Sequence, residues 1–451
     1  MKITPFSREA YQLFHEGALA LSKIESNGIR LDLEYCKTTM EQLKQKIERI
    51  RDQIKADPLI LQYEKETDST FNPNSGKQIS YILFKMLGLK PVKLTPTEQP
   101  STDYDTLTSY DVPLAALIIQ LRKTEKILST YLMNLVAEAP DGWLHPFFHL
   151  NTVTTYRSSS SSPNFQNIPI RDPDFGPLVR KCFIPRPGHL LLEADFSGIE
   201  VAIAACYHKD SNMLKYITDT DSDMHRDVAV MCFMLARELV DKKIRFGAKN
   251  SFTFAEFYGD YYKNTANGLW TYCQKQKIQV AGVGSMFDHL RTKGIRSLED
   301  FTEHIKKVEN WFWYEKFPEY TQWKQDWLDA YHDRGYFISK TGFRCQGIMR
   351  KNEVINFPIQ GSAFHCLLWS LIQVERIMSL RKMRSRIIGQ IHDSILIDVH
   401  QAELESIVAL LRRVLTVELP RVWKWIIVPL RIEIETTPVN GSWADKKLLE
   451  E

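Results

Sequence analysis

The chain has 451 residues, of which 44% are hydrophobic and 25% are charged, and its formal net charge is +3. This length is enough for two or three domains or one large multi-lobed domain, and the composition is that of an ordinary globular protein. No apolar run approaches the roughly 20 residues of a transmembrane helix, and the N-terminus lacks an apolar segment of signal-peptide length. We therefore expect no membrane partner, whereas nucleic acid stays open because a nearly neutral protein can still have a basic cleft.

The seven cysteines are widely spaced, and no two of them form a C-x-x-C pair. A structural zinc site is therefore not expected. An odd number of scattered thiols favours reduced cysteines in a cytosol-like compartment.

The first 140 residues have the pattern of a helical arm. Apolar residues at helical spacing predict a helix over 6–26 that ends at Asn27-Gly28, and a second helix that runs from its cap Asp32 to about residue 55. Further helices are predicted over 75–87 and 113–135. The triplet Asp32-Leu33-Glu34 has the D-x-E form of an exonuclease motif, but a helix-capping aspartate explains it better.

The rest of the chain alternates between short strands and helices. Residues 143–187 are rich in Ser, Thr, Asn and Pro, which predicts loops and short strands. The remaining predictions are a strand and then a helix over 190–201, helices over 223–330, a hairpin over 335–345, a helix over 359–376, a strand–turn–strand over 386–399, a helix over 404–417 and a strand over 428–435. We make no assignment for 265–303. The fold class is therefore α+β, with a small sheet assembled from strands that lie far apart in the sequence.

Two carboxylates stand at the tips of predicted strands of this sheet. Asp195 follows the apolar run Leu190–Leu192, and Asp393 lies in the turn of the hairpin 387–399. Two such carboxylates can hold a pair of divalent cations about 3.5–4 Å apart, which is the geometry of in-line phosphoryl transfer. The alternative for Asp195 is a cap of the helix that starts near Ser197.

Other motifs have both a structural and a functional explanation. Arg245 and Lys249 are four residues apart and share a helix face, which suits either a phosphate site or two surface cations. Composition alone describes the string TTYRSSSSSPNFQNIP (154–169) as a serine-rich linker. An isolated histidine such as His225 is usually a surface or core residue.

Taken in order, these motifs resemble the polymerase region of family A DNA polymerases. The resemblance runs from about Phe14 to Trp443, and it is carried by TTYRSSSSSPNFQNIP (154–169), DFSGIE (195–200), DMHRDVA (223–229), RFGAKNSFTFAEFYG (245–259), NFPIQGS (356–362) and IHDS (391–394). It implies a right-hand fold in which a helical thumb and helical fingers surround an antiparallel palm sheet. By this resemblance the thumb is 1–140, the palm is 141–222 and 335–451, and the fingers are 223–334.

The resemblance also implies a DNA-templated DNA polymerase that extends a primer 3′-hydroxyl with deoxynucleoside triphosphates by a two-metal mechanism. Two Mg²⁺ ions, with Mn²⁺ as a substitute, would be held by Asp195, Asp393 and the carbonyl of Phe196. The catalytic residues would be Asp195, Asp393 and Lys249, which could protonate the departing pyrophosphate. The residues implied for nucleotide binding are His225, Arg245, Lys249, Phe254 under the sugar, and Glu200 against the ribose 2′ position.

The same resemblance assigns residues to the primer and template. Arg157 would reach the minor groove, where degenerate acceptors allow a check of base-pair geometry without sequence readout. The complete set is Arg157, Asn164, Gln166, Asn167, Tyr258, Asn356, Gln360 and His392. The implied partners are primer–template DNA and dNTPs, and the implied location is the cytoplasm of a bacterium or of a phage-infected host.

Three positions depart from the family pattern. Ser394 stands where the family usually has a glutamate, and Asn352 stands where it usually has an arginine. One extra residue separates Lys249 from Phe254, which rotates the following residues by about 100° on an ideal helix. Either a π-bulge absorbs this residue, or Thr253 and Phe257 form the nucleotide face instead. We favour the bulge.

Two alternative functions remain at this point. A single-subunit RNA polymerase shares the palm but should lack a carboxylate at the position of Glu200, and a polymerase relic would bind nucleic acid without catalysis. We see no exonuclease domain ahead of the predicted thumb, so we expect low fidelity from this chain alone. A separate exonuclease or processivity factor is therefore an additional candidate partner.

Overall fold

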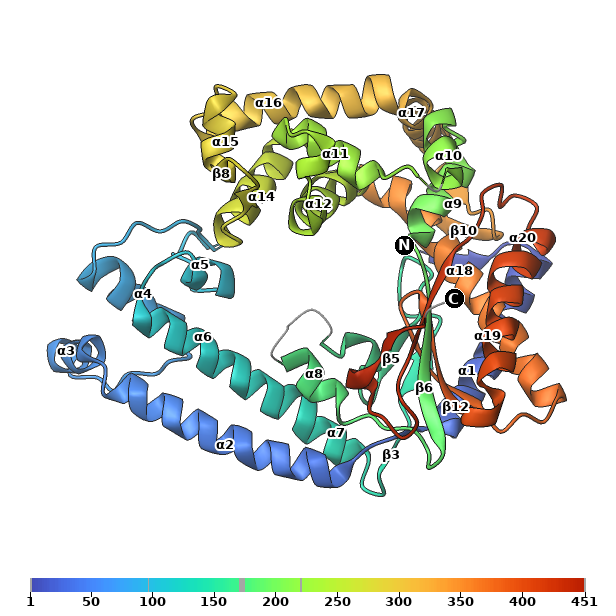
Figure 1. The fold of residues 1–451 in the computed structure, drawn as a ribbon, viewed down its shortest axis with the longest axis horizontal. Helices are drawn as coiled ribbons and strands as arrows, with labels where there is room; N and C mark the ends of the chain where they lie inside the picture. The colour runs from blue at the N-terminus through green and yellow to red at the C-terminus, as the bar shows by residue number, and fades with distance from the viewer. Residues whose placement is uncertain (1, 96, 170–174, 220, 450–451) are drawn as a thin grey trace.

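A five-stranded antiparallel sheet forms the centre of the molecule (Figure 1). The computed structural model describes residues 2–95, 97–169, 175–219 and 221–449. In spatial order the strands are β11 (Arg386–Ile391), β12 (Ser394–His400), β6 (His189–Phe196), β13 (Ile432–Thr436) and β14 (Lys447–Leu448). The predicted α+β class is therefore confirmed, because strands distant in the sequence form one sheet with helical lobes around it.

The register of the central strand places the first candidate carboxylate. β6 lies between β12 and β13, and Asp195 pairs with Ser394 on one side and with Glu433 on the other. Leu190, Leu191 and Leu192 are all buried. A continuous apolar run of this kind is expected where both faces of a strand are covered.

Helices from both ends of the chain pack beside this sheet. α1 (Arg8–Asn27) and α19 (Leu404–Arg412) contact β11 and β12 respectively, and α18 (Lys351–Leu380) contacts α1, α9 (Ile199–His208) and the sheet. The end of α1 at Gly28, where φ is 68°, confirms the predicted stop. Around them lie β1 (Lys2–Pro5), β9 (Tyr336–Ile338), β10 (Phe343–Gln346), a π-helix (Arg413–Glu418), α20 (Leu419–Val422) and 3₁₀ turns at Gln401–Glu403 and Trp443–Asp445.

A helical arm extends from the sheet along one side of the molecule (Figure 1). It consists of α2 (Leu33–Lys55), α3 (Pro58–Thr67), α4 (Gly76–Ser80), a π-helix (Tyr81–Met86), α5 (Tyr104–Thr108), α6 (Pro113–Lys126), a π-helix (Ile127–Leu132) and α7 (Met133–Glu138). The arm has its own hydrophobic core, which includes Ile50, Ile54 and Leu121. Asp32 caps α2 by accepting a hydrogen bond from the Tyr35 amide at 2.9 Å, so its D-x-E triplet begins a helix as predicted.

Short elements connect the arm to the sheet. They are β2 (Ile29–Arg30), β3 (Trp143–Leu144), β4 (Phe147–His149), β5 (Ser159–Ser161), a 3₁₀ turn (Phe165–Asn167) and α8 (Phe175–Arg180). Because β1 pairs with β10 and α1 packs on α18, residues 2–28 lie beside the sheet. The extended part of the arm begins at α2.

A second helical lobe lies opposite the arm, at the top of Figure 1. Its elements are α10 (Ser211–Thr218), α11 (Met224–Phe233), a 3₁₀ turn (Arg237–Leu239), α12 (Lys242–Ala248), a π-helix (Lys249–Thr253), α13 (Phe254–Phe257), α14 (Tyr262–Lys275), β7 (Gln279–Val280), β8 (Gly284–Ser285), α15 (Met286–Thr292), α16 (Leu298–Asn310), a π-helix (Trp311–Lys316) and α17 (Pro318–Arg334). The stretch 265–303, for which the sequence suggests no assignment, thus forms helices and a small hairpin. Lys275 of this lobe ion-pairs with Asp105 of the arm at 2.8 Å, so the two tips meet.

Two general properties of the described residues agree with the composition. All seven cysteines are buried as free thiols. Across the described ranges, no helix is both long enough and apolar enough to cross a bilayer.

Two buried histidines predict a loss of stability in acid. His208 is 6% exposed and His365 is fully buried, and burial lowers the pKa of each to about 3. Below pH 6.5 the unfolded chain would protonate both, whereas the folded chain keeps them neutral until about pH 3. Stability should therefore fall as the pH falls through this window, by about 1.4 kcal/mol per pH unit for each histidine. Urea unfolding between about pH 7 and pH 5 measures the slope, and His365→Gln should make it shallower; an unchanged slope would contradict the assignment.

Candidate active site

The two candidate metal ligands meet at one end of the central sheet. β6 ends next to the β11–β12 turn, and the Phe196 amide donates a hydrogen bond to the Asp393 carbonyl at 3.3 Å. His392, in this turn, has a left-handed backbone conformation with φ of 50°. The fold therefore brings Asp195 and Asp393 together as the sequence predicts. The Phe196 side chain is 2% exposed, so only the backbone of that residue is available to the site.

Burial disfavours the charged forms of both carboxyl groups. The buried Oδ1 of Asp195 has no hydrogen-bond partner among the described residues. Burial, followed by the Asp393 charge, raises the pKa of Asp195 to about 8, and burial also raises the pKa of Asp393. In this environment the two carboxyl groups would either be protonated or bind a cation. Within the described residues no cluster of three or more His, Cys, Asp or Glu side chains offers a larger metal site.

Three of the predicted residues link the sheet region to the upper lobe. Glu200, in the first turn of α9, forms an ion pair with Arg157 and accepts a hydrogen bond from the Tyr258 hydroxyl. Burial and the Glu200 charge raise the pKa of Tyr258, which keeps the phenol protonated. Glu200 and Tyr258 line one small pocket together with Phe254, Asn356 and Gln360.

The predicted nucleotide-binding side chains converge on the lower face of the upper lobe. Arg245 pairs with Asp223 at 2.7 Å, and the His225 ring meets the edge of the Phe254 ring at 5.6 Å. The Lys249 ammonium lies 5.2 Å from the centre of the Phe254 ring. Burial, then the charges of Arg245 and Lys249, lowers the pKa of His225 to about 4, so its imidazole is neutral near pH 7. The site therefore combines two fixed cations with a neutral hydrogen-bonding ring.

The extra residue after Lys249 is absorbed as we favoured. A π-helix spans Lys249–Thr253 and the α-helix resumes at Phe254, which confirms the bulge. Thr253 is fully buried and Phe257 packs against Phe312 and Trp313. Thr253 is therefore not available to the site, and Phe257, although it also lines the small pocket, is held against the aromatic rings of the lobe.

Several predicted primer–template residues already have partners inside the protein. Gln166 is 8% exposed, and its Nε2 donates to Ser158 Oγ at 2.8 Å and to Gln390 Oε1 at 2.7 Å. Asn356 Nδ2 donates to the Tyr258 carbonyl at 3.1 Å, and Asn164 Oδ1 accepts a hydrogen bond from Ser160. Of the predicted set, Asn164, Asn167, Tyr258 and His392 are exposed, and Arg157 and Gln360 are half-buried.

Sequence reasoning missed two residues that shape the site. Gln390, 1% exposed, donates from Nε2 to the His392 carbonyl at 2.7 Å and so supports the turn that carries Asp393. Glu433 stands opposite Asp195 on β13 and accepts a hydrogen bond from Ser197 at 3.1 Å. Gln390 could have been noticed in the sequence, because it is a polar residue inside the apolar strand 386–391. Glu433 had no such signal, because its importance depends on which strand pairs with β6.

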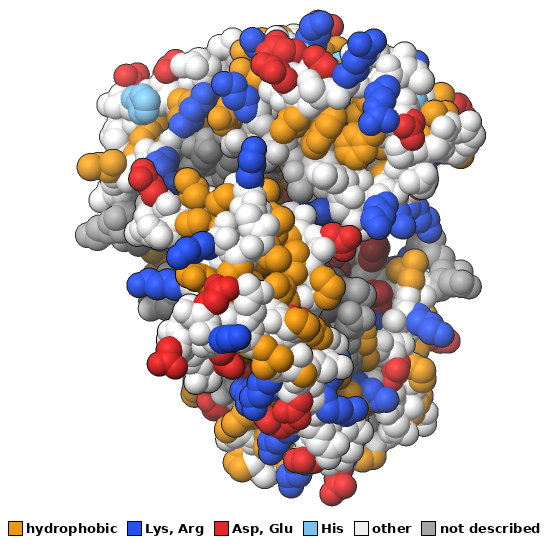
Figure 2. Space-filling view, turned by 90° about the vertical axis from the view of Figure 1, so that its left-hand side faces the viewer, with side chains coloured by type: hydrophobic (Ala, Val, Ile, Leu, Met, Phe, Trp, Pro, Cys, Tyr) orange, Lys and Arg blue, Asp and Glu red, His pale blue; other side chains and the backbone are white. Residues whose placement is uncertain are grey.

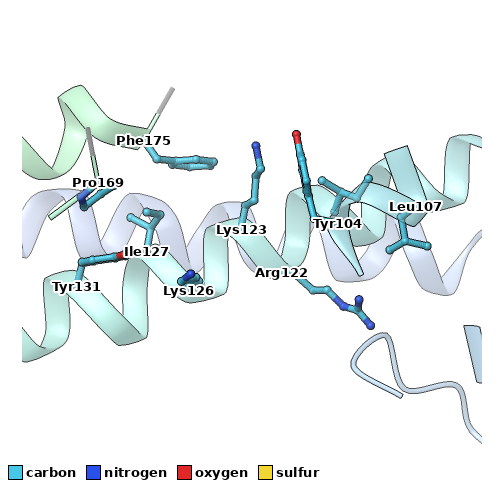
Figure 3. Close-up of a pocket in the computed structure, with 10 residues that line it drawn as sticks. Tyr104, Leu107, Arg122, Lys123, Lys126, Ile127, Tyr131, Pro169 and Phe175 are labelled. Atoms are coloured by element: carbon cyan, nitrogen blue, oxygen red, sulfur yellow. The ribbon is translucent and has the colours of Figure 1, made fainter. Parts of the chain in front are cut away.

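Basic and aromatic groups line a pocket on the helical arm. In Figure 2 acidic side chains lie deep in a recess, and Lys and Arg side chains surround its mouth. Figure 3 shows a pocket of about 350 Å³ where α6 meets α8, lined by Arg122, Lys123, Lys126, Tyr104 and Phe175. Lys123 lies 4.7 Å from the centre of the Tyr104 ring. Cationic and aromatic groups of this kind suit a nucleic-acid backbone and its bases.

The antiparallel sheet with two carboxylates at its end, placed between a helical arm and a helical lobe, defines the right-hand fold of nucleic-acid polymerases. The chain belongs to DNA polymerase family A, whose sequence model matches residues 33–445.

Relatives and a solved structure agree with this assignment. The chain is 29% identical to the thermostable DNA polymerase I of Thermus filiformis over 95% of its length and 47% of that protein, and 29% identical to DNA polymerase I of Bacillus subtilis over 95% of its length and 45% of that protein. Its fold matches the POL domain of Pol1 from M. smegmatis, in complex with DNA primer–template and dNTP, with a TM-score of 0.74 and 25% identity over 96% of this chain and 70% of that one. The chain thus spans about half the length of the curated relatives.

Proposed function

We propose that this chain is a DNA-directed DNA polymerase that extends a primer 3′-hydroxyl with deoxynucleoside triphosphates. The observation that carries the proposal is that Asp195 and Asp393 meet at one end of the sheet, while Arg245, paired with Asp223, and Lys249, beside Phe254, lie in the upper lobe. The hydroxyl would attack the α-phosphate and release pyrophosphate. Primer–template DNA and a dNTP accompany the solved relative, and we extend both partners to this chain.

The carboxylate pair fits a pair of Mg²⁺ ions, with Mn²⁺ as a substitute. The orphaned Oδ1 of Asp195 and the mutual repulsion of the two acids are properties that a divalent cation would relieve. Asp195, Asp393 and the Phe196 carbonyl would hold the ions. Such ions, when bound, lower the pKa of the attacking hydroxyl and neutralise developing phosphate charge. Ser394 is 3% exposed and donates to the Ile391 carbonyl at 3.1 Å, so it closes the turn and leaves the ligand role to the two aspartates.

The side chains of this chain divide the remaining tasks. Arg245, Lys249 and neutral His225 would bind the triphosphate, and Lys249 would donate a proton to the departing pyrophosphate. The half-buried Phe254 ring would pack under the sugar, and Tyr258 would stack near the template base. The primer terminus would be surrounded by Arg157, Asn164, Gln166, Asn167, Asn356, Gln360 and His392. Of these, Gln166 and Asn356 would act indirectly, through the segments to which they are already hydrogen-bonded.

We assign the helical arm to a thumb within 1–140, the sheet and its helices to a palm of 141–222 and 335–451, and the upper lobe to fingers of 223–334. In this assignment α1 supports the palm from within the N-terminal segment. The cytoplasm of a bacterium or a phage-infected host is the location that this function implies.

Primer extension on a defined template tests the proposal. The purified chain should add templated dNTPs only when Mg²⁺ or Mn²⁺ is present. Extension from ribonucleotides at equal efficiency would favour the RNA polymerase alternative. Binding of primer–template without any extension would favour the relic.

Glu200→Ala should relax the choice of sugar. The Glu200 carboxylate is held by Arg157 and Tyr258, so it can exclude a 2′-hydroxyl from the space beside it. We expect the ratio of ribonucleotide to deoxynucleotide kcat/KM to rise about 10- to 100-fold, the usual worth of one steric exclusion. Single-nucleotide incorporation kinetics measure it, with Glu238→Ala on the exposed surface as the control. An unchanged ratio would remove Glu200 from sugar selection.

Phe254→Tyr should change discrimination against dideoxynucleotides. Its ring lies between His225 and Lys249 at the sugar end of the site, so an added hydroxyl would sit where the missing 3′-hydroxyl leaves space. The ratio of dideoxynucleotide to deoxynucleotide incorporation measures the effect. Phe246→Tyr is a matched control, because Phe246 is on the same run of helix but 55% exposed. Equal ratios for both variants would contradict the register described above.

A further inference from the structure

A buried carboxylate lies under the proposed nucleotide site, and no step above uses it. Glu256 belongs to α13, two residues after Phe254 and two before Tyr258, and it is only 2% exposed. Burying a carboxyl group costs free energy unless hydrogen bonds compensate it. Its position between Phe254, assigned to the nucleotide, and Tyr258, assigned to the template base, therefore requires a reason.

The partners of Glu256 come from three other elements of the upper lobe. Its Oε2 accepts a hydrogen bond from Trp313 Nε1 at 2.8 Å, and its Oε1 accepts one from Thr265 Oγ1 at 3.4 Å. The ammonium of Lys324, on α17, lies 3.0 Å from the centre of the Trp313 ring. Burial raises the pKa of Glu256 to about 8, so its carboxyl group is largely protonated near neutral pH. Burial lowers the pKa of Lys324 to about 7. Because the Lys324 ammonium packs on its ring, the donor Trp313 is itself held in place.

The local backbone explains why an anchor is needed here. The π-helix Lys249–Thr253 ends where α13 begins, and α13 has only four residues. Each helical residue turns the chain by about 100°, so a slip of the π-helix by one residue would move Phe254 away from the nucleotide and Tyr258 away from the template base. Phe257 packs on the rings of Phe312 and Trp313, and this non-directional contact alone does not select one rotation of α13. A hydrogen bond is directional and selects one rotation.

We propose that Glu256 is a positioning residue: its hydrogen bond from Trp313 fixes the rotation of α13 and so holds Phe254 at the incoming nucleotide and Tyr258 near the template base. This inference rests on the proposed polymerase function. Because Glu256 is only 2% exposed, it would act through Phe254 and Tyr258 and not by its own contact with nucleotide or DNA. Its effect should therefore appear in nucleotide affinity and discrimination, while the chemistry of a correctly bound nucleotide changes little.

The test compares variants that keep or remove this bond. Glu256→Gln keeps the acceptor and mimics a protonated carboxyl, whereas Glu256→Leu and Trp313→Phe each remove one partner. We expect Glu256→Gln to stay within about 2-fold of the wild-type KM for dNTP. The other two variants should each raise KM about 10-fold, the usual effect of one lost buried hydrogen bond, with kcat changed less than about 3-fold. Glu315→Gln, on the exposed side of the same π-helix as Trp313, is the control.

Two further readouts separate positioning from a general loss of stability. Binding of dNTP to a complex with a dideoxy-terminated primer measures affinity without chemistry, and it should weaken in parallel with KM. The double variant Glu256→Leu/Trp313→Phe should be no worse than either single variant, because both remove the same bond. Wild-type KM and wild-type dideoxynucleotide discrimination in Trp313→Phe would overturn the inference, whatever its melting temperature. Failure of the wild-type chain to extend a primer would instead refute the proposed function.

Discussion

Asp195→Asn and Asp393→Asn are each expected to reduce primer extension by at least about 10³-fold. Each substitution removes one of two anionic ligands from a site where Asp195 Oδ1 has no hydrogen-bond partner among the described residues, and the transition-state charge in phosphoryl transfer is stabilised by several kcal/mol through such ions. Single-turnover incorporation of one correct dNTP at saturating Mg²⁺ measures the loss. Asp326→Asn, an exposed residue of α17, is the matched control and should keep wild-type activity.

The same two variants should have the opposite effect on the stability of the metal-free protein. Burial disfavours both charged forms, as the raised pKa values of Asp195 and Asp393 indicate, so a neutral amide should raise the melting temperature when no divalent ion is present. The increase in melting temperature that Mg²⁺ causes in the wild type should become smaller. Primer–template binding should persist, because the basic surfaces are unchanged. Equal extension by wild type and Asp393→Asn would refute the mechanism.

Lys249→Ala is expected to have the second largest effect, a loss of about 10²- to 10³-fold in kcat/KM for dNTP. The Lys249 ammonium lies beside Phe254 and near His225, where charge would develop on the departing pyrophosphate, and removal of one such donor typically costs this much. If the lysine acts in the transition state, the loss should be mainly in kcat; if it only binds the ground state, KM should rise instead. Pre-steady-state incorporation separates these two parameters.

Two variants on the same run of helix complete this experiment. Lys242→Ala removes an exposed lysine from the first turn of α12 and should leave both parameters unchanged. Arg245→Ala should raise KM and should also release Asp223, whose pKa the Arg245 guanidinium helps to keep low against the effect of burial. A wild-type kcat/KM in Lys249→Ala would show that the triphosphate lies elsewhere.

Local features of the fold followed the sequence closely. Gly28 ends α1, Asp32 caps α2, and the extra residue after Lys249 forms the π-helix. Each of these depends on interactions within one or two helical turns, so the chain itself carries the signal. The boundaries of longer elements were less accurate. α18 spans Lys351–Leu380 whereas 359–376 was predicted, since Pro358 and the polar first turn gave no apolar stripe.

Contacts between distant segments were beyond the reach of the sequence. The role predicted for Gln166 at the primer stays a prediction, and no local pattern indicated that its amide also joins Ser158 to Gln390, which supports the turn of Asp393. The stretch 265–303 had no recognisable motif, and it folds because α14 and α16 bury apolar faces against each other. These outcomes depend on packing partners that no local pattern specifies.

The sequence by itself predicted which side chains would carry the chemistry of the proposed function: the two aspartates, the cations of 245–249 and the carboxylate of Glu200. Only the tertiary structure decided their neighbours, because β6 pairs with β12 and β13 from remote parts of the chain and so sets Asp195 between Ser394 and Glu433. The tertiary structure likewise decided the partner of Glu256, because Trp313 lies on another helix. Residue type determines what a group can do, whereas burial and partners, which exist only in the folded chain, determine its charge, its position and therefore its role.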